Sequence, residues 1–152
     1  MASTISAATL TVTHTEAITL GGQAMGVTNT LTIASVTEVY KRVVTVPTSS
    51  KTLLTFSTTV GAGTFIVSTT KYVRVTNKDD TNYIELVING ASNNSLCVKL
   101  EAGKSFLLGI GASSVDANDS AAITSASFVS LSTITAKANT AAVDVELFVA
   151  GT

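Results

Sequence analysis

Apolar and polar residues alternate near the end of the chain, and this two-residue period constrains the fold more than any other feature. From Val143 to Val149 the sequence reads Val-Asp-Val-Glu-Leu-Phe-Val. Successive side chains of a β-strand point to opposite faces, so the pattern predicts a strand with one buried face. Threonine and valine, which are abundant throughout, favour the same extended backbone because a branched Cβ is crowded in a helix. The sequence therefore predicts an all-β protein.

Similar segments recur from residue 36 onward, separated by short runs rich in Gly, Asn, Asp and Ser. We expect about eight strands in this region, drawn from ten candidate segments, and no helical period of useful length is present. The candidate segments are 36–46, 51–57, 64–68, 72–76, 83–88, 96–100, 104–110, 122–128, 133–138 and 142–149. They predict an antiparallel two-sheet β-sandwich, jelly-roll-like, over 36–152. An immunoglobulin-like sandwich is the near alternative, although its Cys and Trp landmarks are absent from this sequence.

Two hairpins are predicted within the sandwich. The first spans 72–88 and turns at the polar run 77–81. The second spans 96–110 and turns at 101–103, where a glycine is available for positive φ. Each would place two consecutive strands side by side in one sheet.

The alternation also assigns side chains to faces. In the first hairpin Arg74 and Glu85 share the outer face, so we expect them to pair across the strands. A slip in the period at Val43 and Val44 predicts a bulge or a change of sheet there. The predicted core consists of Val73, Val75, Ile84, Leu86, Val98, Leu100, Phe106, Leu108, Val143, Val145 and Leu147.

Residues 1–35 differ from the rest because they are rich in Thr, Ala and Gly and contain one charged residue, Glu16. Apolar residues suggest one strand around Leu10 and a second around Leu31, with a glycine-containing turn at 21–26. The segment has too few large side chains to build a core of its own. We therefore expect an N-terminal arm that gains order through contact with another copy or another protein.

The residue types that carry catalysis and metal binding are sparse. His14 is the only histidine and lies in the arm, so a Ser-His-Asp device is not expected. Asp79 and Asp80 are adjacent in a polar turn, where general acid–base chemistry lacks a desolvated cleft. The run 116–119 has calcium-ligand types but lacks the glycine and distal glutamate of an EF-hand. We predict no catalytic, cofactor-binding or metal-binding residues, and hence no enzyme.

Two further sets of residues suggest binding sites only weakly. The glycine pairs in 61–63 and 109–111 lack the following helix and the lysine of a nucleotide loop, so we expect turns. Tyr40, Tyr72 and Tyr83 lie on outward positions of the alternation. They could stack on sugar rings, but no Asn, Asp or Trp is grouped with them, so we expect them to pack on the surface or at an interface.

Charge excludes further classes of function. Charged residues make up 12% of the chain, and the net charge is −1 with an isoelectric point near 5.7. Nucleic-acid binding needs clustered basic residues, yet Lys41 and Arg42 are the only adjacent basic pair. No apolar run reaches the ~18 residues of a membrane span, and the N-terminal sequence lacks the pattern of a secretory signal. The single Cys97 allows no intrachain disulfide. Its position is opposite in phase to Leu96 and Val98, so it faces outward or into a second layer; we expect a buried, inert thiol, with a reactive or intermolecular one as the alternative.

Part of this patterning is similar to that of a known group of proteins. The similar segments are Tyr72-Val73-Arg74-Val75-Thr76-Asn77, Tyr83-Ile84-Glu85-Leu86, Val98-Lys99-Leu100-Glu101-Ala102-Gly103-Lys104-Ser105-Phe106-Leu107-Leu108 and Ile134-Thr135-Ala136-Lys137-Ala138 with the strand after it. Over roughly residues 70–150 the chain resembles small jelly-roll virion proteins of tailed bacteriophages. The arm has no counterpart in this resemblance.

The resemblance implies a non-enzymatic subunit located in the virion, most often a capsid decoration (cement) protein. A small tail or fibre component, or a carbohydrate- or receptor-binding sandwich, is the alternative. A low-charge β protein must cover its edges and apolar patches, and fixed neighbours in an assembly do so. The expected partners are other copies of the chain, as a homotrimer, and the major capsid protein or another virion protein. No nucleic acid or membrane partner is expected.

Overall fold

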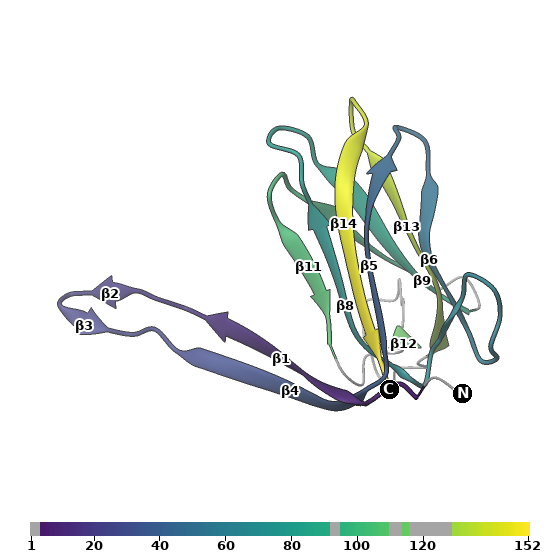
Figure 1. The fold of residues 1–152 in the computed structure, drawn as a ribbon. Coiled ribbons are helices and arrows are strands. Elements are labelled where there is room, and N and C mark those ends of the chain that lie inside the picture. The colour runs from purple at the N-terminus through teal and green to yellow at the C-terminus, as the bar shows by residue number, and fades with distance from the viewer. Residues whose placement is uncertain (1–3, 92–94, 110–113, 116–128) are drawn as a thin grey trace, which may run out of the picture.

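The computed structural model describes residues 4–91, 95–109, 114–115 and 129–152 of the chain. All regular elements in these ranges are strands, and Figure 1 shows them as an upright sandwich with a long hairpin projecting from its base. The strands are β1 (Ala8–Thr15), β2 (Thr19–Leu20), β3 (Gln23–Ala24), β4 (Thr28–Val36), β5 (Glu38–Val46), β6 (Lys51–Ser57), β7 (Phe65–Ile66), β8 (Thr70–Asn77), β9 (Ile84–Gly90), β10 (Ser95–Leu100), β11 (Ser105–Leu108), β12 (Ser114–Val115), β13 (Val129–Ala138) and β14 (Val143–Gly151).

The prediction of an all-β antiparallel sandwich is confirmed. One sheet has four strands in the order β11-β8-β14-β5, and the other follows the order β10-β9-β13-β6-β7, with β12 beside β13. The ladders are antiparallel except for the short β6–β7 pair. Within the two sheets, the strand pairs are nested along the chain: β5 pairs with β14, β6 with β13, β8 with β11, and β9 with β10.

Both predicted hairpins are wrong, because each pair of strands belongs to two different sheets. β8 lies in the four-stranded sheet, whereas β9 lies in the opposite one. In the same way β10 and β11 are separated by the core. The turns 77–81 and 101–103 therefore carry the chain across the sandwich. An alternating strand buries the same face whether its successor lies beside it or opposite it, so the period alone does not distinguish these arrangements.

The predicted core is correct at its centre and incomplete at its margins. Eight of the eleven residues named above are buried, and the other three, Val98, Phe106 and Leu108, are half-buried against them. Those three lie on β10 and β11, the outermost strands of their sheets. An edge strand has a neighbour on one side only, so its inward side chains stay partly in contact with solvent.

Several predicted strands have different bounds in the structure: Val36 ends β4 and does not begin β5, β7 is shorter than the segment 64–68, and β13 begins before residue 133. The predicted bulge at Val43 and Val44 is wrong: β5 keeps a continuous register with β14, and Val44 and Val46 face the core while Val39 and Val43 face outward. The slip in the period arises because Val43 is an exposed apolar residue. The candidate strand 122–128 lies outside the described residues.

A buried polar residue, Asn77, ties together the chain crossings at one end of the sandwich. It is fully buried at the end of β8. Its Nδ2 donates hydrogen bonds to the carbonyl oxygens of Asn82 (2.8 Å) and Leu100 (3.1 Å), and its Oδ1 accepts one from the Asp79 N–H (2.9 Å). These three hydrogen bonds satisfy backbone groups where the chain crosses from one sheet to the other and the regular ladder hydrogen bonds end.

Candidate interaction surface

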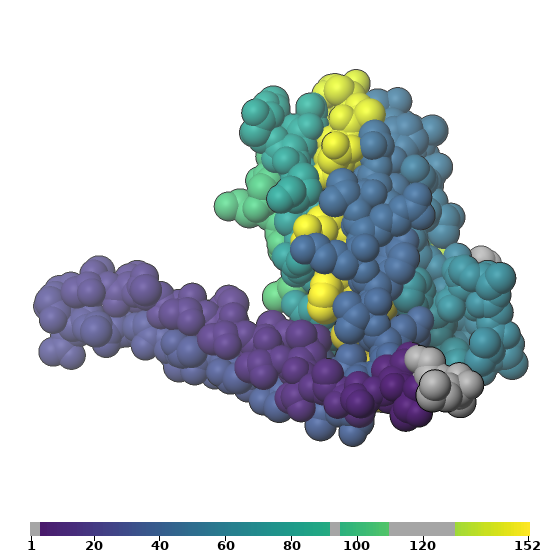
Figure 2. All heavy atoms as spheres, viewed as in Figure 1, coloured from purple at the N-terminus to yellow at the C-terminus, as the bar shows by residue number. Residues whose placement is uncertain are grey.

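The N-terminal segment forms a β-hairpin, which we call the arm (residues 8–36). β1 and β4 pair antiparallel from Leu10 with Ile33 to Thr15 with Thr28. At the far end Gly21 and Gly22, both with positive φ, form the tight turn between β2 and β3. Figure 2 shows that most of the arm stands clear of the sandwich. A two-stranded hairpin alone is marginally stable in water, so this geometry calls for a partner surface.

Exposed apolar side chains concentrate on the outer part of the arm. Ile18 is 57% exposed, Leu20 65% and Met25 63%, and Val27 and Leu31 are also exposed. No Lys, Arg or Asp occurs in the arm, and Glu16 is its one formal charge. Natural edge strands are usually protected by charged side chains, by proline or by covering elements. The described part of the arm has none of these along β1 and β4, so it is suited to pairing with another chain.

The base of the arm is anchored to its own sandwich, a contact that sequence reasoning did not predict. Ile33 and Val36 are buried against Tyr72 and Ala150, with Leu10, Val12 and Phe148 packed around them. The Tyr72 and Phe148 rings meet edge to face at 6.0 Å. This cluster lies on the outer face of the four-stranded sheet, separate from the main core.

The expectation for the tyrosines needs correction at two positions. Tyr72 does point to the outer face, but the arm covers it, and burial raises the pKa of its hydroxyl, with Arg74 partly opposing the shift. Tyr40 instead packs against the core, edge to face with Phe65 at 5.4 Å. Tyr83 is half-buried beside Lys99, whose Nζ lies 4.3 Å from the ring centroid. The three rings are therefore not gathered into a sugar-stacking site.

A β-bulge fixes the direction in which the arm leaves the sandwich. Two residues, Ala34 and Ser35, lie opposite the single residue Thr9 in the β1–β4 ladder. Ser35 has φ of +59°, the left-handed conformation in which bulges of this kind usually place glycine. After Val36 the chain passes through Thr37 directly into β5. The bulge thus sets the angle between the arm and the first strand of the sandwich.

This backbone conformation leads to a testable prediction about Ser35. A branched Cβ is strained at positive φ, so Ser35→Val should lower the free energy of unfolding by about 1–2 kcal/mol relative to Ser35→Gly. Chemical denaturation of the two purified variants measures this difference. Ala34→Val, at the exposed neighbouring position without positive φ, is the matched control and should change stability little. Equal effects at the two positions would refute the role assigned to the bulge.

A charged cluster lies beside the arm on the same outer face. Glu146 accepts a hydrogen bond from Arg74, and its other carboxylate oxygen lies 3.6 Å from Lys41 Nζ. Partial desolvation favours a higher pKa for Glu146, but Lys41 and Arg74 outweigh it and hold the pKa below its ordinary value. The predicted Arg74–Glu85 pair is wrong, since these residues lie in different sheets; Glu85 approaches Lys137 instead, at 3.9 Å.

The remaining sequence candidates do not come together into a site. Asp79 accepts hydrogen bonds from the N–H groups of Asn82 (2.6 Å) and Thr81 (2.8 Å), which lower its pKa, so it acts as a turn residue. His14 is exposed on β1. Cys97 is exposed on β10, against the expectation of a buried thiol, because its side chain points away from the core side of an edge strand.

The glycine-containing candidates and the calcium-type run do not form a binding site among the described residues either. Gly61 and Gly63 form a turn, closed by the Thr64 N–H donating to the Gly61 carbonyl at 3.3 Å. The run 116–119 and most of 109–111 lie outside the described residues. Among the described residues there is no group of three or more His, Cys, Asp or Glu placed to hold a metal ion. Nor does that part of the chain contain a helix long and apolar enough to cross a membrane.

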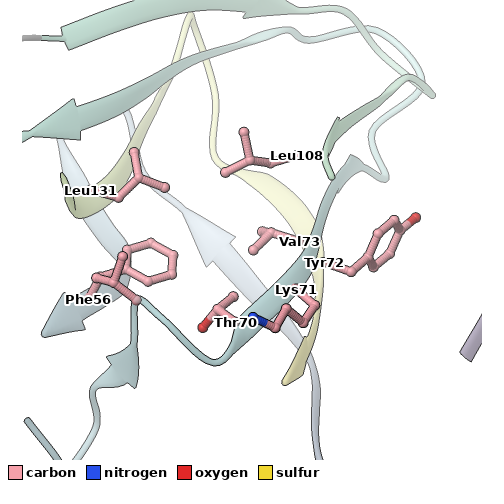
Figure 3. Close-up of a pocket in the computed structure, with 8 residues that line it drawn as sticks. Phe56, Thr70, Lys71, Tyr72, Val73, Leu108 and Leu131 are labelled. Atoms are coloured by element: carbon pink, nitrogen blue, oxygen red, sulfur yellow. The ribbon is translucent and has the colours of Figure 1, made fainter. Parts of the chain in front are cut away.

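One hollow, which lies between the two sheets at the end of the core, is too small for an organic ligand. It measures ≈ 10 Å³, about the space of one water molecule. Figure 3 shows Phe56, Val73, Leu108 and Leu131 around it, with Tyr72 directed to the other side of its strand. Apolar walls at this size indicate imperfect packing at the end of the core. Wider hollows of ≈ 600, 460 and 310 Å³ lie at the surface beside Asp79, beside Tyr40, and between the arm and Phe148. The arm and the adjoining sheet surface are the principal candidates for function, because exposed apolar side chains concentrate on the arm.

No protein-family model matches the chain, and no curated protein matches it significantly.

Proposed function

We propose that this protein is a non-enzymatic structural subunit of a bacteriophage virion, and specifically a capsid decoration subunit that stabilises the head shell. The observation that carries the proposal is the arm: an almost uncharged hairpin with exposed apolar side chains, held rigidly at its base and free along most of its length. Such a segment has little use in a freely diffusing monomer. In an assembly it reaches a neighbouring subunit.

We infer further that the sandwich is a jelly roll. Its nested pairing, first strand with last and so on inward to β9 and β10, is what results when one long antiparallel ribbon is wound into two facing sheets. This arrangement supports the resemblance drawn from residues 70–150. In this proposal the sandwich holds the base of the arm, and the arm extends from it to contact a neighbouring subunit.

The energetic logic of a decoration subunit requires only modest contacts from each copy. Many copies on a symmetric shell act together, so contacts of a few kcal/mol each resist expansion of the whole particle. The low charge of the arm suits binding through backbone pairing and apolar contact, which salt weakens little.

Removal of the protein from the particle tests this function. We expect particles assembled without it to form but to break at a lower temperature, as followed by release of encapsidated DNA during heating. Adding the purified protein back should restore the wild-type temperature. Particles that form without the protein and are equally heat-resistant would contradict a stabilising role.

Copy number separates the head from the tail. A decoration subunit should be present on the order of hundreds of copies per particle, in fixed ratio to the major shell protein, whereas a tail component should be present at about a dozen or fewer. Quantitative mass spectrometry of purified particles measures this ratio. A ratio in the lower range would refute the head assignment.

A further inference from the structure

The strand β5 forms a long open edge of the four-stranded sheet. The Lys78 N–H donates to the Asp144 carbonyl at 2.8 Å, so the backbone of Asp144 faces the β8 side of β14. The N–H and C=O groups of successive residues point to opposite sides of a strand. Those of Val143 and Val145 therefore point toward β5, and those of their partners Val46 and Val44 point toward β14. The N–H and C=O groups of the intervening residues, among them Val43, therefore point outward from the sheet.

Little in the described part of the chain covers this edge. Among the described residues, the backbone groups of Val39, Lys41 and Val43 make no hydrogen bond to another segment. Only the Thr45 carbonyl is satisfied, by Lys51 Nζ at 2.9 Å. The side chains of Val39 and Val43 are more than half exposed, at 58% and 55%. A nine-residue edge with exposed valines is a template for strand addition.

The arm presents matching strands. The Glu16 N–H donates to the Val27 carbonyl at 2.8 Å, which places the inward backbone groups on Val12 and Leu31 and the outward groups on their neighbours. In the regular ladder, all residues whose backbone N–H and C=O groups point away from the partner strand are threonines: Thr11, Thr13, Thr15, Thr28, Thr30 and Thr32. These uncharged, β-branched residues suit an added strand. β4 has nine residues and β1 has eight, close to the nine of β5.

The arm and the open edge lie on opposite sides of the molecule. In Figure 1 the arm runs out on the side of β11, whereas β5 is the far strand of the same sheet. The arm is therefore directed away from the β5 edge of its own chain. A second copy placed in the direction of the arm can present its β5 edge to it. Such a contact is head-to-tail, and repeated around a rotation axis it closes into a ring.

Charge is also complementary between the two surfaces. Glu16 is the only formal charge of the arm, and Arg42 lies on β5. Neither forms an ion pair within the described residues. β5 carries two basic residues, Lys41 and Arg42, against one acidic residue, Glu38, so docking of the arm on a neighbouring β5 brings surfaces of opposite net charge together.

We propose that the arm of one copy docks on the β5 edge of a second copy, extending its four-stranded sheet by strand addition. The arm's donor strand is β1 or β4, with its threonine-bearing edge against Val39, Lys41 and Val43 of the neighbour. This names the self-interaction surface within the assembly role proposed above. It is tested on the purified chain alone, so that its failure is distinct from failure of the virion role.

Proline at the open edge provides the test. Val43→Pro removes an N–H that points outward and makes no hydrogen bond to the described residues, so the sandwich should keep its fold. Val43→Thr keeps the N–H and a β-branched side chain and is the matched control. Sedimentation equilibrium of the full chain should show the same closed oligomer for wild type and Val43→Thr. For Val43→Pro the dissociation constant should rise by about tenfold or more, because the added ladder is interrupted at its centre.

Two variants on the arm complete the experiment. Thr13→Pro and Thr30→Pro each remove one outward N–H, from β1 and from β4, and one of them should weaken association as Val43→Pro does. If Val43→Pro does not fold, as judged by circular dichroism, Val39→Pro replaces it. A wild-type chain that stays monomeric at all concentrations would overturn the proposal. So would folded edge variants on β5, or a full pair of folded arm variants, that associate as tightly as wild type.

Discussion

Leu86→Ala is expected to lower the free energy of unfolding by about 2–5 kcal/mol. Leu86 is fully buried in β9, with Val98 on one neighbouring strand and Ala136 on the other directly beside it. The core around it is built mainly from Val, Leu and Ile on two rigid sheets. Strands fixed on both sides cannot move in to fill the space, so most of the cavity should remain. Urea denaturation followed by circular dichroism measures the loss.

The matched control for this substitution is Leu107→Ala. Leu107 is 47% exposed on β11, so removal of the same atoms should change stability by no more than about 0.5 kcal/mol. If both variants lost similar stability, Leu86 would not occupy the centre of the core and the strand register of β9 would be wrong.

Asn77→Ala is expected to cost about 2–4 kcal/mol, a large effect for a polar residue. The side chain satisfies the carbonyls of Asn82 and Leu100 and the N–H of Asp79. Without it, polar groups at a buried chain crossing lose their partners, and each such group costs about 1–3 kcal/mol unless water reaches it. Thermal and urea unfolding of the purified variant measure the loss.

Two further substitutions separate hydrogen bonding from volume at this position. Asn77→Asp keeps the size but replaces the donor group by an acceptor, so it should be at least as destabilising at neutral pH as Asn77→Ala. Asn89→Ala removes an amide that bonds Thr133 on the partly exposed outer face, and should cost about 1 kcal/mol or less. A stable Asn77→Asp variant would show that the two donated hydrogen bonds carry little energy.

Side-chain periodicity was sufficient to predict the strands and the centre of the core. Val143, Val145 and Leu147 are buried because alternation on a pleated strand leaves them no other face. The same reasoning did not reveal that β8 and β9 belong to opposite sheets, since Val75 and Leu86 point to the core in either arrangement. Which strands pair depends on contacts between residues far apart in sequence, and period carries no information about them.

The candidate surface was predicted in part. The two strands and the glycine turn expected in the first 35 residues correspond to β1, β4 and the turn at Gly21 and Gly22, but the anchor on Tyr72 and Phe148 was not anticipated. Tyr72 sits on an outward position, and an outward aromatic residue is equally consistent with solvent and with a covering element. The structural role of Asn77 was not predicted, because the sequence shows only an asparagine at the start of a polar turn. Its burial arises from the meeting of two chain crossings, which the sequence pattern does not reveal.

The anchor of the arm has a consequence for the order of events during synthesis. The arm is made before the surface that holds it, because Phe148 and Ala150 follow the arm by more than a hundred residues. β5, which follows the arm, likewise waits for β14 as its only sheet neighbour. A partly translated chain therefore carries an arm without a fixed direction. Only a chain in which β14 has been made and has folded can present the arm at a defined angle, so the docking proposed above requires a sandwich that is already assembled.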